Sequence, residues 1–313
     1  MENSENRDIV VAALKHAAPY IRMFKRKIFV LKAGGEVFAN SESTRNMIRQ
    51  IAILHQVGIG VILVHGGGQQ STELAEQLGI NSKFVGGRRV TDDRSLEVSA
   101  MVLNGKINTD ILAACREIDL PAIGISGVDA GLINAHRRPP VKVEGHEPVL
   151  VDYGFVGDID SVDAEVLSTQ IDSGLMPVIS PLSADASGTL LNINADTVAA
   201  ALASAVGAEK LILITGAPGI LEDSHDPGSL VSYIDLSGLQ DLRDGGSLAA
   251  GMLPKASAIE AAIKGGVPRV HVISFKLPDT LLLEVFTNEG TGTLVVENIN
   301  TLSAEEQGPV NQA

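Results

Sequence analysis

The chain has 313 residues, 45% of them apolar, with 32 glycines, one cysteine and a formal net charge of −14 at neutral pH. The single cysteine, Cys115, excludes a disulfide framework and a cysteine-based metal site, and the negative charge argues against nucleic-acid binding. No apolar run reaches the length of a membrane span and the first residues are polar and acidic, so we expect a cytoplasmic protein without a membrane partner.

The first predicted element is a helix that precedes the core of the fold. Apolar side chains recur at helical spacing over residues 9–26, and Pro19 in this stretch predicts a kink. Because the helix comes before the first strand, we expect it to pack against another subunit or to act in regulation.

From residue 28 onward, predicted strands and helices alternate. The predicted strands cover residues 28–33, 59–65, 121–125, 176–180, 189–193, 210–215, 269–274 and 292–297. The predicted helices cover residues 43–58, 70–78, 93–118, 161–173, 194–206, 236–243, 254–265 and 279–286, with β-hairpins between residues 131 and 157. This alternation predicts an α/β protein, a three-layer αβα sandwich with a mostly parallel central sheet.

Helix caps and lobes follow from the same pattern. The predicted caps are Ser41 or Ser43, Asp92 or Asp93, and Asn194. We expect an N-terminal helix over 1–26, lobes over 27–181 and 182–300, and a loose tail over 301–313.

Two predicted strands end in glycine-rich loops. The strand over 59–65 runs into Gly66-Gly67-Gly68, and the strand over 28–33 carries Lys32 just before Gly34-Gly35. Ligands bind at the carboxyl edge of open α/β sheets, and a bare glycine backbone can turn its N–H groups toward an anion. A single glycine pair would indicate only a tight turn, and neither loop fits a P-loop or dinucleotide pattern. Two such loops with one lysine predict a phosphate-handling site.

Two charged residues stand at predicted helix starts. Asp196 could hold two lysines in place, or it could be an ordinary acid in the first turn of its helix. Lys255 follows Pro254 in the first turn of the next helix, which is either a good anion site or a surface position.

Arginine and histidine residues complete the candidate set. Arg88 and Arg89 follow Gly86-Gly87, and an arginine can bind a carboxylate through two parallel hydrogen bonds. His65 has no second ligand at suitable spacing, so we interpret it as structural rather than as a metal ligand or base.

Eight motifs in chain order carry a resemblance to a known family. They are Lys32-Ala-Gly-Gly, His65-Gly-Gly-Gly-Gln, Gly87-Arg-Arg-Val-Thr, Ser126-Gly-Val-Asp, Gly154-Phe-Val-Gly, Asn192-Ile-Asn-Ala-Asp, Pro218-Gly-Ile-Leu and Gly251-Met-Leu-Pro-Lys. Over about residues 9–297 the chain resembles the acetylglutamate kinases of the amino acid kinase family. The resemblance implies phosphorylation of the side-chain carboxylate of N-acetyl-L-glutamate by Mg-ATP, a step of arginine synthesis.

The resemblance also implies roles for individual residues. Lys32 and Lys255 would neutralise the transferring phosphoryl group, and Asp196 would orient them. The loops of Gly34, Gly35, Gly67 and Gly68 would hold the phosphates and the reacting carboxylate, while Arg89 and Asn192 would bind the α-carboxylate. Adenine would lie near Thr215, Gly216, Gly219 and Met252. The resemblance implies ATP and Mg²⁺, the latter held by phosphates and water rather than by protein ligands.

A regulatory branch of the same family is implied by both ends of the chain. The kinked N-terminal helix and the stretch from Leu283 resemble arginine-inhibited members that assemble as trimers of dimers. The candidate arginine contacts are Tyr20, Lys210, His271, Glu284 and Gly290. Glu284 could pair with a guanidinium group, or it could be an ordinary solvated helix residue.

The chain also departs from the family pattern. Gly216 stands where the family carries an aspartate, and Ser274-Phe-Lys-Leu replaces an Asp-Gly-Arg run. Ala33 replaces a larger residue, and Ala250-Gly251 replaces a glycine pair. Two alternatives therefore stay open: a kinase for N-succinylglutamate or an aminoadipate derivative, and a catalytically weak paralogue that only binds ligands.

Overall fold

The computed structural model describes residues 2–86, 88–142, 150–223, 226, 228–249, 251–288 and 290–302. Gly87 and Ala250 of the motifs, and residues 303–313 of the predicted tail, lie outside the described residues.

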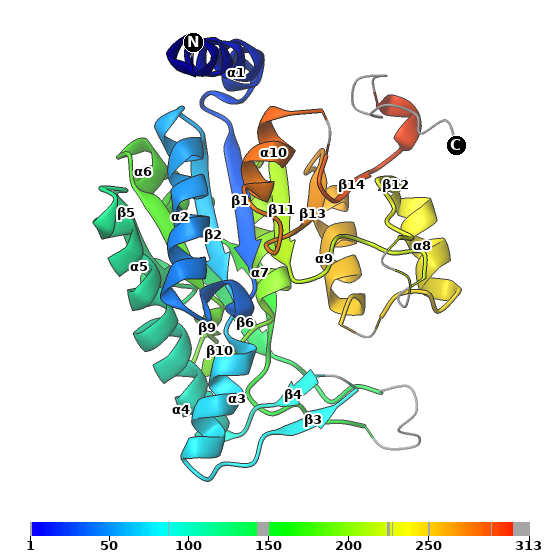
Figure 1. Cartoon of the computed structure of the whole chain (residues 1–313). Helices are drawn as coiled ribbons and strands as arrows, with labels where there is room; N and C mark the ends of the chain where they lie inside the picture. Colours follow the sequence, from blue (N-terminus) through cyan, green and yellow to red (C-terminus); the bar gives the residue numbers. More distant parts are fainter. Residues whose placement is uncertain are drawn as a thin grey trace.

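One eight-stranded sheet forms the middle layer, in the order β12-β14-β13-β11-β1-β2-β8-β5 (Figure 1). Its strands are β1 Ile28–Ala33, β2 Gly60–His65, β5 Ala122–Ser126, β8 Met176–Ser180, β11 Lys210–Thr215, β12 Tyr233–Asp235, β13 Val270–Ser274 and β14 Thr293–Val296. All neighbours are parallel except the antiparallel pair β13 and β14. The prediction of a mostly parallel sheet is confirmed, and burial of the central strands on both faces explains their continuous apolar runs.

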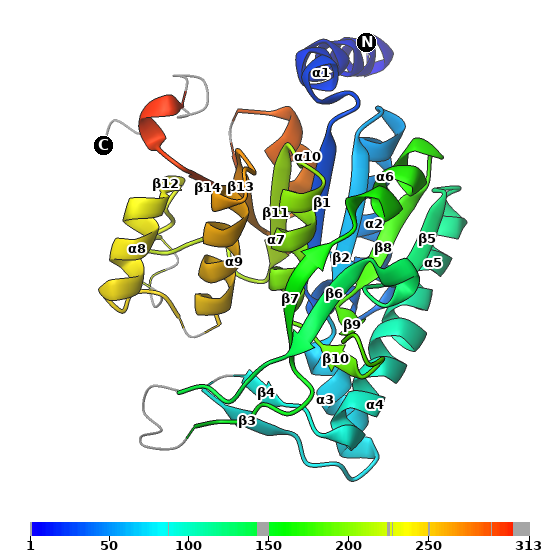
Figure 2. The same ribbon diagram turned by 180° about the vertical axis from the view of Figure 1, so that it is seen from behind.

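Helices cover both faces of this sheet. The helices of the described residues are α1 Glu2–Phe24, α2 Ser41–Gln56, α3 Gly68–Gln77, α4 Asp93–Ala100, α5 Asn108–Glu117, α6 Ala164–Asp172, α7 Ala195–Ala205, α8 Leu236–Asp244, α9 Leu253–Lys264 and α10 Thr280–Phe286. One core cluster joins α2, α5 and α10 to one face, and it contains the buried Cys115. The other cluster joins α6, α7 and α9 to the opposite face (Figures 1 and 2). Leu31 and Val30 of β1 point into different clusters, as strand alternation requires.

Two helix predictions need correction. Asn40 caps α2, because the helix begins at Ser41 and the Asn40 side chain accepts a hydrogen bond from the Ser43 backbone N–H. The predicted single helix over 93–118 has the right span but contains a wider π-helical turn at Met101–Ile107 between α4 and α5. Asp92 caps α4, in agreement with one of the two predicted residues.

Short strands build two smaller sheets beside the main one. Strands β6 Ile133–Arg137, β7 Gly157–Val162, β9 Leu182–Ala184 and β10 Leu190–Asn192 pair in the order β10-β9-β6-β7. A separate hairpin pairs β3 Lys83–Val85 with β4 Arg88–Val90. Neither this hairpin nor β9 was predicted from the sequence.

Helix α1 lies beyond the amino end of β1, at the edge of the sheet opposite the glycine loops (Figure 1). It begins earlier than predicted and continues through Pro19, where the kink stays a prediction. Ile9, Val10 and Leu14 are 66%, 56% and 63% exposed, and Phe24 at the end of the helix is buried.

No helix in the described part of the chain combines the length and apolarity needed to cross a bilayer.

Candidate active site

A cavity of about 590 Å³ opens where β1 and β2 end in their glycine loops. Its lining contains the predicted residues Lys32, Gly34, Gly35, Gly67, Gly68, Arg89, Asn192 and Asp196. Residues far apart in the sequence thus share one cavity at the carboxyl edge of the sheet, as expected for an open parallel sheet.

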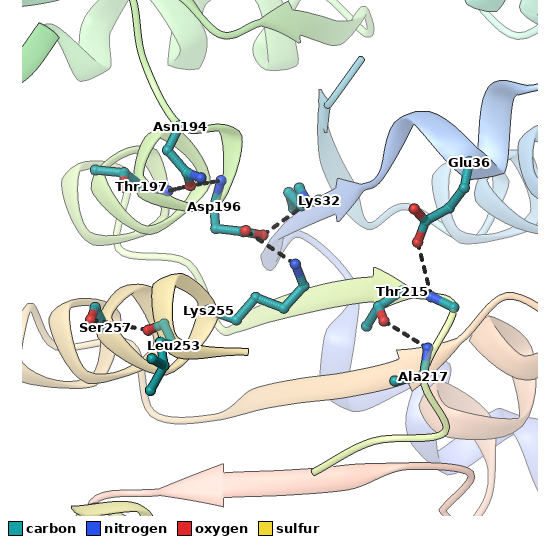
Figure 3. A network of polar contacts seen from close by, with 11 residues as sticks. Lys32, Glu36, Asn194, Asp196, Thr197, Thr215, Ala217, Leu253, Lys255 and Ser257 are labelled. Atoms are coloured by element: carbon teal, nitrogen blue, oxygen red, sulfur yellow. Dashed lines mark hydrogen bonds and ion pairs between the residues drawn. The ribbon is translucent and has the colours of Figure 1, made fainter. Parts of the chain in front are cut away.

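The lysines and the aspartate form one ionic cluster beside the cavity (Figure 3). The two Asp196 carboxylate oxygens lie 2.9 Å from Lys32 Nζ and 3.2 Å from Lys255 Nζ. Burial by itself would raise the pKa of Asp196, but the two ammonium groups outweigh it and hold that pKa below its ordinary value. Burial lowers the pKa of Lys32, and the ion pair with Asp196 opposes this effect. The site therefore concentrates positive charge in a chain whose net charge is −14.

Local structure explains how these charges are positioned. The Asn194 side chain caps α7 by accepting hydrogen bonds from the N–H groups of Asp196 and Thr197. Asp196 is thus both an acid in a first helical turn and the partner of two lysines, so the two interpretations made from the sequence are compatible. Pro254 stands in the first turn of α9, which carries no capping side chain, and this helix start lines the cavity near Lys255.

Gly35 and Gly67 are packed too closely against other residues to carry side chains without a shift of their neighbours. A Cβ atom at Gly35 would lie 2.3 Å from Gln70 Oε1, and one at Gly67 would lie 2.4 Å from Ile107 Cδ1. Gln70 Nε2 also donates a hydrogen bond of 2.6 Å to the carbonyl of Gly35, which ties the two loops together. Gly68 faces open space at the start of α3. Gln70 was not assigned a role from the sequence, although it directly follows the glycine motif.

Arg89 reaches the cavity from the β3–β4 hairpin. Its guanidinium group donates hydrogen bonds to Ser82, Thr72 and the carbonyl of Gly68, and it lies 4.9 Å from the centre of the Phe84 ring. Asn192 lines the same cavity from the end of β10.

Arg138 also lines the cavity, and the sequence analysis missed it. Asp158 holds its guanidinium group through Nε and Nη2, at 3.0 and 2.6 Å from Oδ1. Arg138 directly follows β6 and Asp158 lies in β7, so the pairing of these two strands brings the two side chains together.

The predicted nucleotide contacts lie at the same sheet edge but outside the cavity lining. Thr215 ends β11 and is buried, with its hydroxyl accepting a hydrogen bond from the Ala217 N–H. Gly219 packs against Leu230 and Thr293, and Met252 directly precedes α9. The N–H of Gly216 donates a hydrogen bond to the carboxylate of Glu36.

His65 is a buried neutral side chain between the two loops and α5. Its Nδ1 lies 3.1 Å from the carbonyl of Gly66, and its Nε2 lies 3.3 Å from Asn108 Nδ2. The carbonyl can only accept and the amide nitrogen can only donate, so Nδ1 carries the proton. Burial lowers the pKa of His65 from 6.5 to about 4, and the hydrogen bond to Gly66 opposes this shift.

This neutral His65 makes folding stability depend on pH. In the unfolded chain the ring binds a proton near pH 6.5, whereas the folded ring does so only near pH 4. The stabilisation is therefore complete above pH 6.5 and is lost as the pH falls toward 4, by about 2 kcal/mol at pH 5. We expect His65→Gln to flatten this part of the curve of unfolding free energy against pH, measured by urea denaturation. An unchanged slope in the variant would contradict this assignment.

A second polar cluster lies at the opposite edge of the sheet, where β11 and β13 begin. Lys210 Nζ is 3.1 Å from His271 Nε2, and His271 Nδ1 is 2.6 Å from Glu284 Oε1. Burial by itself would raise the pKa of Glu284, but its bonds to His271 and Thr291 lower it to about 2. The side chain of Glu284 is only 5% exposed, so the interpretation as a solvated helix residue is wrong.

The end of α1 covers this cluster. Lys210 Nζ lies 5.0 Å from the centre of the Phe24 ring, and the Tyr20 hydroxyl hydrogen-bonds Asn288. Gly290 stands next to Thr291, which bonds Glu284. The structure therefore brings all five predicted arginine contacts to one junction of α1, β11, β13 and α10.

The described residues contain no group of three or more histidine, cysteine, aspartate or glutamate side chains that could hold a metal ion. Both oxygens of Asp196 face lysines. These residues do not fit a protein-bound Mg²⁺ site.

A mostly parallel sheet whose glycine loops meet a lysine pair at one edge is the framework of an anion-handling transferase. The sequence model of the amino acid kinase family matches residues 27–274, and the chain belongs to this family. Acetylglutamate kinase from Myxococcus xanthus is 47% identical over 91% of this chain and 94% of its own length. The corresponding enzymes of Archaeoglobus fulgidus and Symbiobacterium thermophilum are 41% and 44% identical, over 93% and 91% of this chain and 99% and 97% of their own lengths.

Solved structures agree with this fold. N-acetylglutamate synthase from Neisseria gonorrhoeae, complexed with coenzyme A and N-acetyl-glutamate, superposes with a TM-score of 0.80 at 27% identity. That match covers 92% of this chain, which spans 63% of the synthase chain. Carbamate kinase from Giardia lamblia bound to AMP-PNP has a TM-score of 0.63 at 18% identity, covering 87% of this chain and 99% of its own, and shows the shared fold alone.

Proposed function

We propose that this protein transfers the γ-phosphoryl group of ATP to the side-chain carboxylate of N-acetyl-L-glutamate, as an acetylglutamate kinase of arginine biosynthesis. The observation that carries the proposal is the Lys32–Asp196–Lys255 cluster beside a cavity lined by two glycine loops. Relatives named acetylglutamate kinase match nearly the whole chain, which supports this substrate above others.

The arrangement suits transfer between two anions. A substrate carboxylate is already a nucleophile, so its oxygen can form a bond to the γ-phosphorus while the bond to the β–γ bridging oxygen breaks and ADP leaves. No general base is needed. The two ammonium groups and the N–H groups of the glycine loops would offset the negative charge of both partners, which is the main barrier. Asp196 would keep the lysines at fixed positions despite their mutual repulsion.

ATP and its Mg²⁺ enter as one substrate in this proposal. The start of α9 lacks a capping side chain and adjoins Lys255, so it suits the phosphates. Adenine would lie beside Thr215, Gly216, Gly219 and Met252. We thus assign residues 27–181 to the acyl amino acid and residues 182–300 to ATP, in a cytoplasmic enzyme.

The acyl amino acid would occupy the end of the cavity lined by arginines. Arg89 and Asn192 would bind its α-carboxylate, and Arg138 lines the same cavity. An N-succinylglutamate or aminoadipate substrate would use the same α-carboxylate contacts. The three candidate substrates are therefore distinguished by comparing their rates of phosphorylation.

The test is ATP-dependent phosphorylation of N-acetyl-L-glutamate, with the acyl phosphate trapped as a hydroxamate. We expect turnover with N-acetyl-L-glutamate and much slower turnover with N-succinylglutamate and aminoadipate analogues. Faster turnover of an analogue would replace the proposed substrate. If none of the three compounds were phosphorylated although ATP binds, the result would favour a catalytically weak paralogue that only binds ligands.

We further propose that L-arginine inhibits the enzyme at the Lys210–His271–Glu284 cluster. We also propose that the protein is a homo-oligomer, either a dimer or a trimer of dimers in which α1 joins the dimers. The buried carboxylate of Glu284 could pair with a guanidinium group, and the exposed apolar side chains of α1 suit a subunit contact. The same synthase has also been solved with coenzyme A and L-arginine, with a TM-score of 0.79 at 27% identity, covering 92% of this chain and 65% of its own.

Glu284→Gln is expected to raise the L-arginine concentration for half inhibition by at least about tenfold, because it removes the charge that would pair with the guanidinium group. The measurement is an arginine titration of the kinase assay, with light scattering to follow assembly. Glu209→Gln, which removes the partner of the exposed Lys27, is the control. Equal inhibition of all three proteins would rule out the cluster as the arginine site.

A further inference from the structure

Glu36 joins two loops that are far apart in the sequence. It stands in the short helical turn Gly35–Phe38 after β1, and its Oε1 accepts a hydrogen bond of 3.0 Å from the N–H of Gly216 after β11. Figure 3 shows this contact on the side of Lys32 away from the α7 helix start. A single carboxylate thus connects the glycine loop of β1 with the predicted nucleotide loop.

Two glycines flank this carboxylate. A Cβ atom at Gly34 would lie 3.1 Å from Glu36 Cδ and 3.2 Å from Oε1, which is tighter than ordinary contact. A Cβ atom at Gly216 would lie 3.5 Å from the same Oε1 and 3.6 Å from Lys276 Cε. The carboxylate therefore lies between Gly34 and Gly216, and a side chain at Gly34 would crowd it, whereas one at Gly216 would make only ordinary contact.

The position of Glu36 also links it to the reacting groups. It lines the same cavity as Lys32, and its negative charge helps to raise the pKa of Lys32 against the effect of burial. A carboxylate at this cavity works against an anionic ligand, since like charges destabilise each other. The structural contact that it makes is the hydrogen bond from the Gly216 N–H, which connects the two loops.

We propose that Glu36 is a positioning residue, which holds the loop after β11 against the loop after β1 and so places the nucleotide relative to Lys32. This inference rests on the proposed function, because it assigns the loop of Thr215 to Gly219 to ATP. A hydrogen bond from a backbone N–H to a charged acceptor is stronger than one between neutral groups, so its loss should loosen the nucleotide loop measurably.

The experiment compares Glu36→Ala, Glu36→Gln and the control Glu42→Ala, which removes an exposed carboxylate in the first turn of α2. We expect Glu36→Ala to weaken AMP-PNP binding in calorimetry, and to raise KM for ATP, by about tenfold. KM for N-acetyl-L-glutamate and Tm should stay at their original values. Glu36→Gln should remain within about threefold, because its amide oxygen can still accept from Gly216.

Two outcomes would overturn the proposal. One is unchanged AMP-PNP affinity in Glu36→Ala. The other is a parallel loss of affinity for both substrates with a lowered Tm, which would indicate a purely structural contact. Because AMP-PNP binding needs no turnover, it tests Glu36 even if N-acetyl-L-glutamate proves not to be the substrate.

Discussion

Lys32→Ala and Lys255→Ala are each expected to lower kcat by about three orders of magnitude. Each change removes one of the two ammonium groups that pair with Asp196 beside the cavity, so the charge of the transferring phosphoryl group would lose a partner in a largely buried cluster. Steady-state assays with saturating ATP and N-acetyl-L-glutamate measure the effect. Asp196 keeps one lysine in either variant, so we expect the fold to persist.

Lys264→Ala is the matched control for this pair. Lys264 lies at the other end of α9 from Lys255, 65% exposed and paired with Glu260. Its removal should leave kcat within about twofold, as is usual for exposed ion pairs. If Lys32→Ala or Lys255→Ala kept near-normal turnover with an intact fold, the catalytic assignment would be wrong.

Asp196→Asn is expected to lower kcat by about two to three orders of magnitude and also to lower Tm. The amide cannot neutralise two lysines, so the buried ammonium groups would repel each other and move apart. The lysines hold the pKa of Asp196 below 3.8 against the opposing effect of burial. Its stabilising effect is thus complete above pH 3.8 and is lost only as the pH falls through the lower folded value, so the defect should be present across the neutral range.

The control for Asp196→Asn is Asp110→Asn, which breaks the exposed ion pair between Asp110 on α5 and Lys106 in the preceding π-helical turn. Kinetics and thermal unfolding of the two variants should differ clearly. Normal kcat in Asp196→Asn would mean that the lysines are positioned by other contacts.

Much of the site follows from the sequence because its residues stand at the ends of regular elements. Lys32, Gly34 and Gly67 stand at the ends of apolar runs that predict buried strands, and Asn194 marks a predicted helix start; the structure confirms both. The eight ordered motifs then placed the chain in its family, which the match over residues 27–274 confirms. The roles of the individual residues stay predictions.

Contacts between distant segments could not be predicted in the same way. The cavity joins Arg89 from an unpredicted hairpin to Arg138 beside β7, and Glu36 reaches Gly216 across 180 positions of sequence. None of these pairs leaves a periodic pattern, because each depends on how separate elements pack.

The sequence by itself determined the alternation of strands and helices, the glycine loops and the charged residues beside them, since hydrophobic periodicity and backbone preferences act over a few neighbouring residues. Only the tertiary structure decided the order β11-β1-β2, which brings Asp196 between Lys32 and Lys255 and sets Glu36 against Gly216. It also buried Glu284 under the end of α1. The physical reason is that strand order and buried ion pairs arise from the packing of the whole chain, which no local segment specifies.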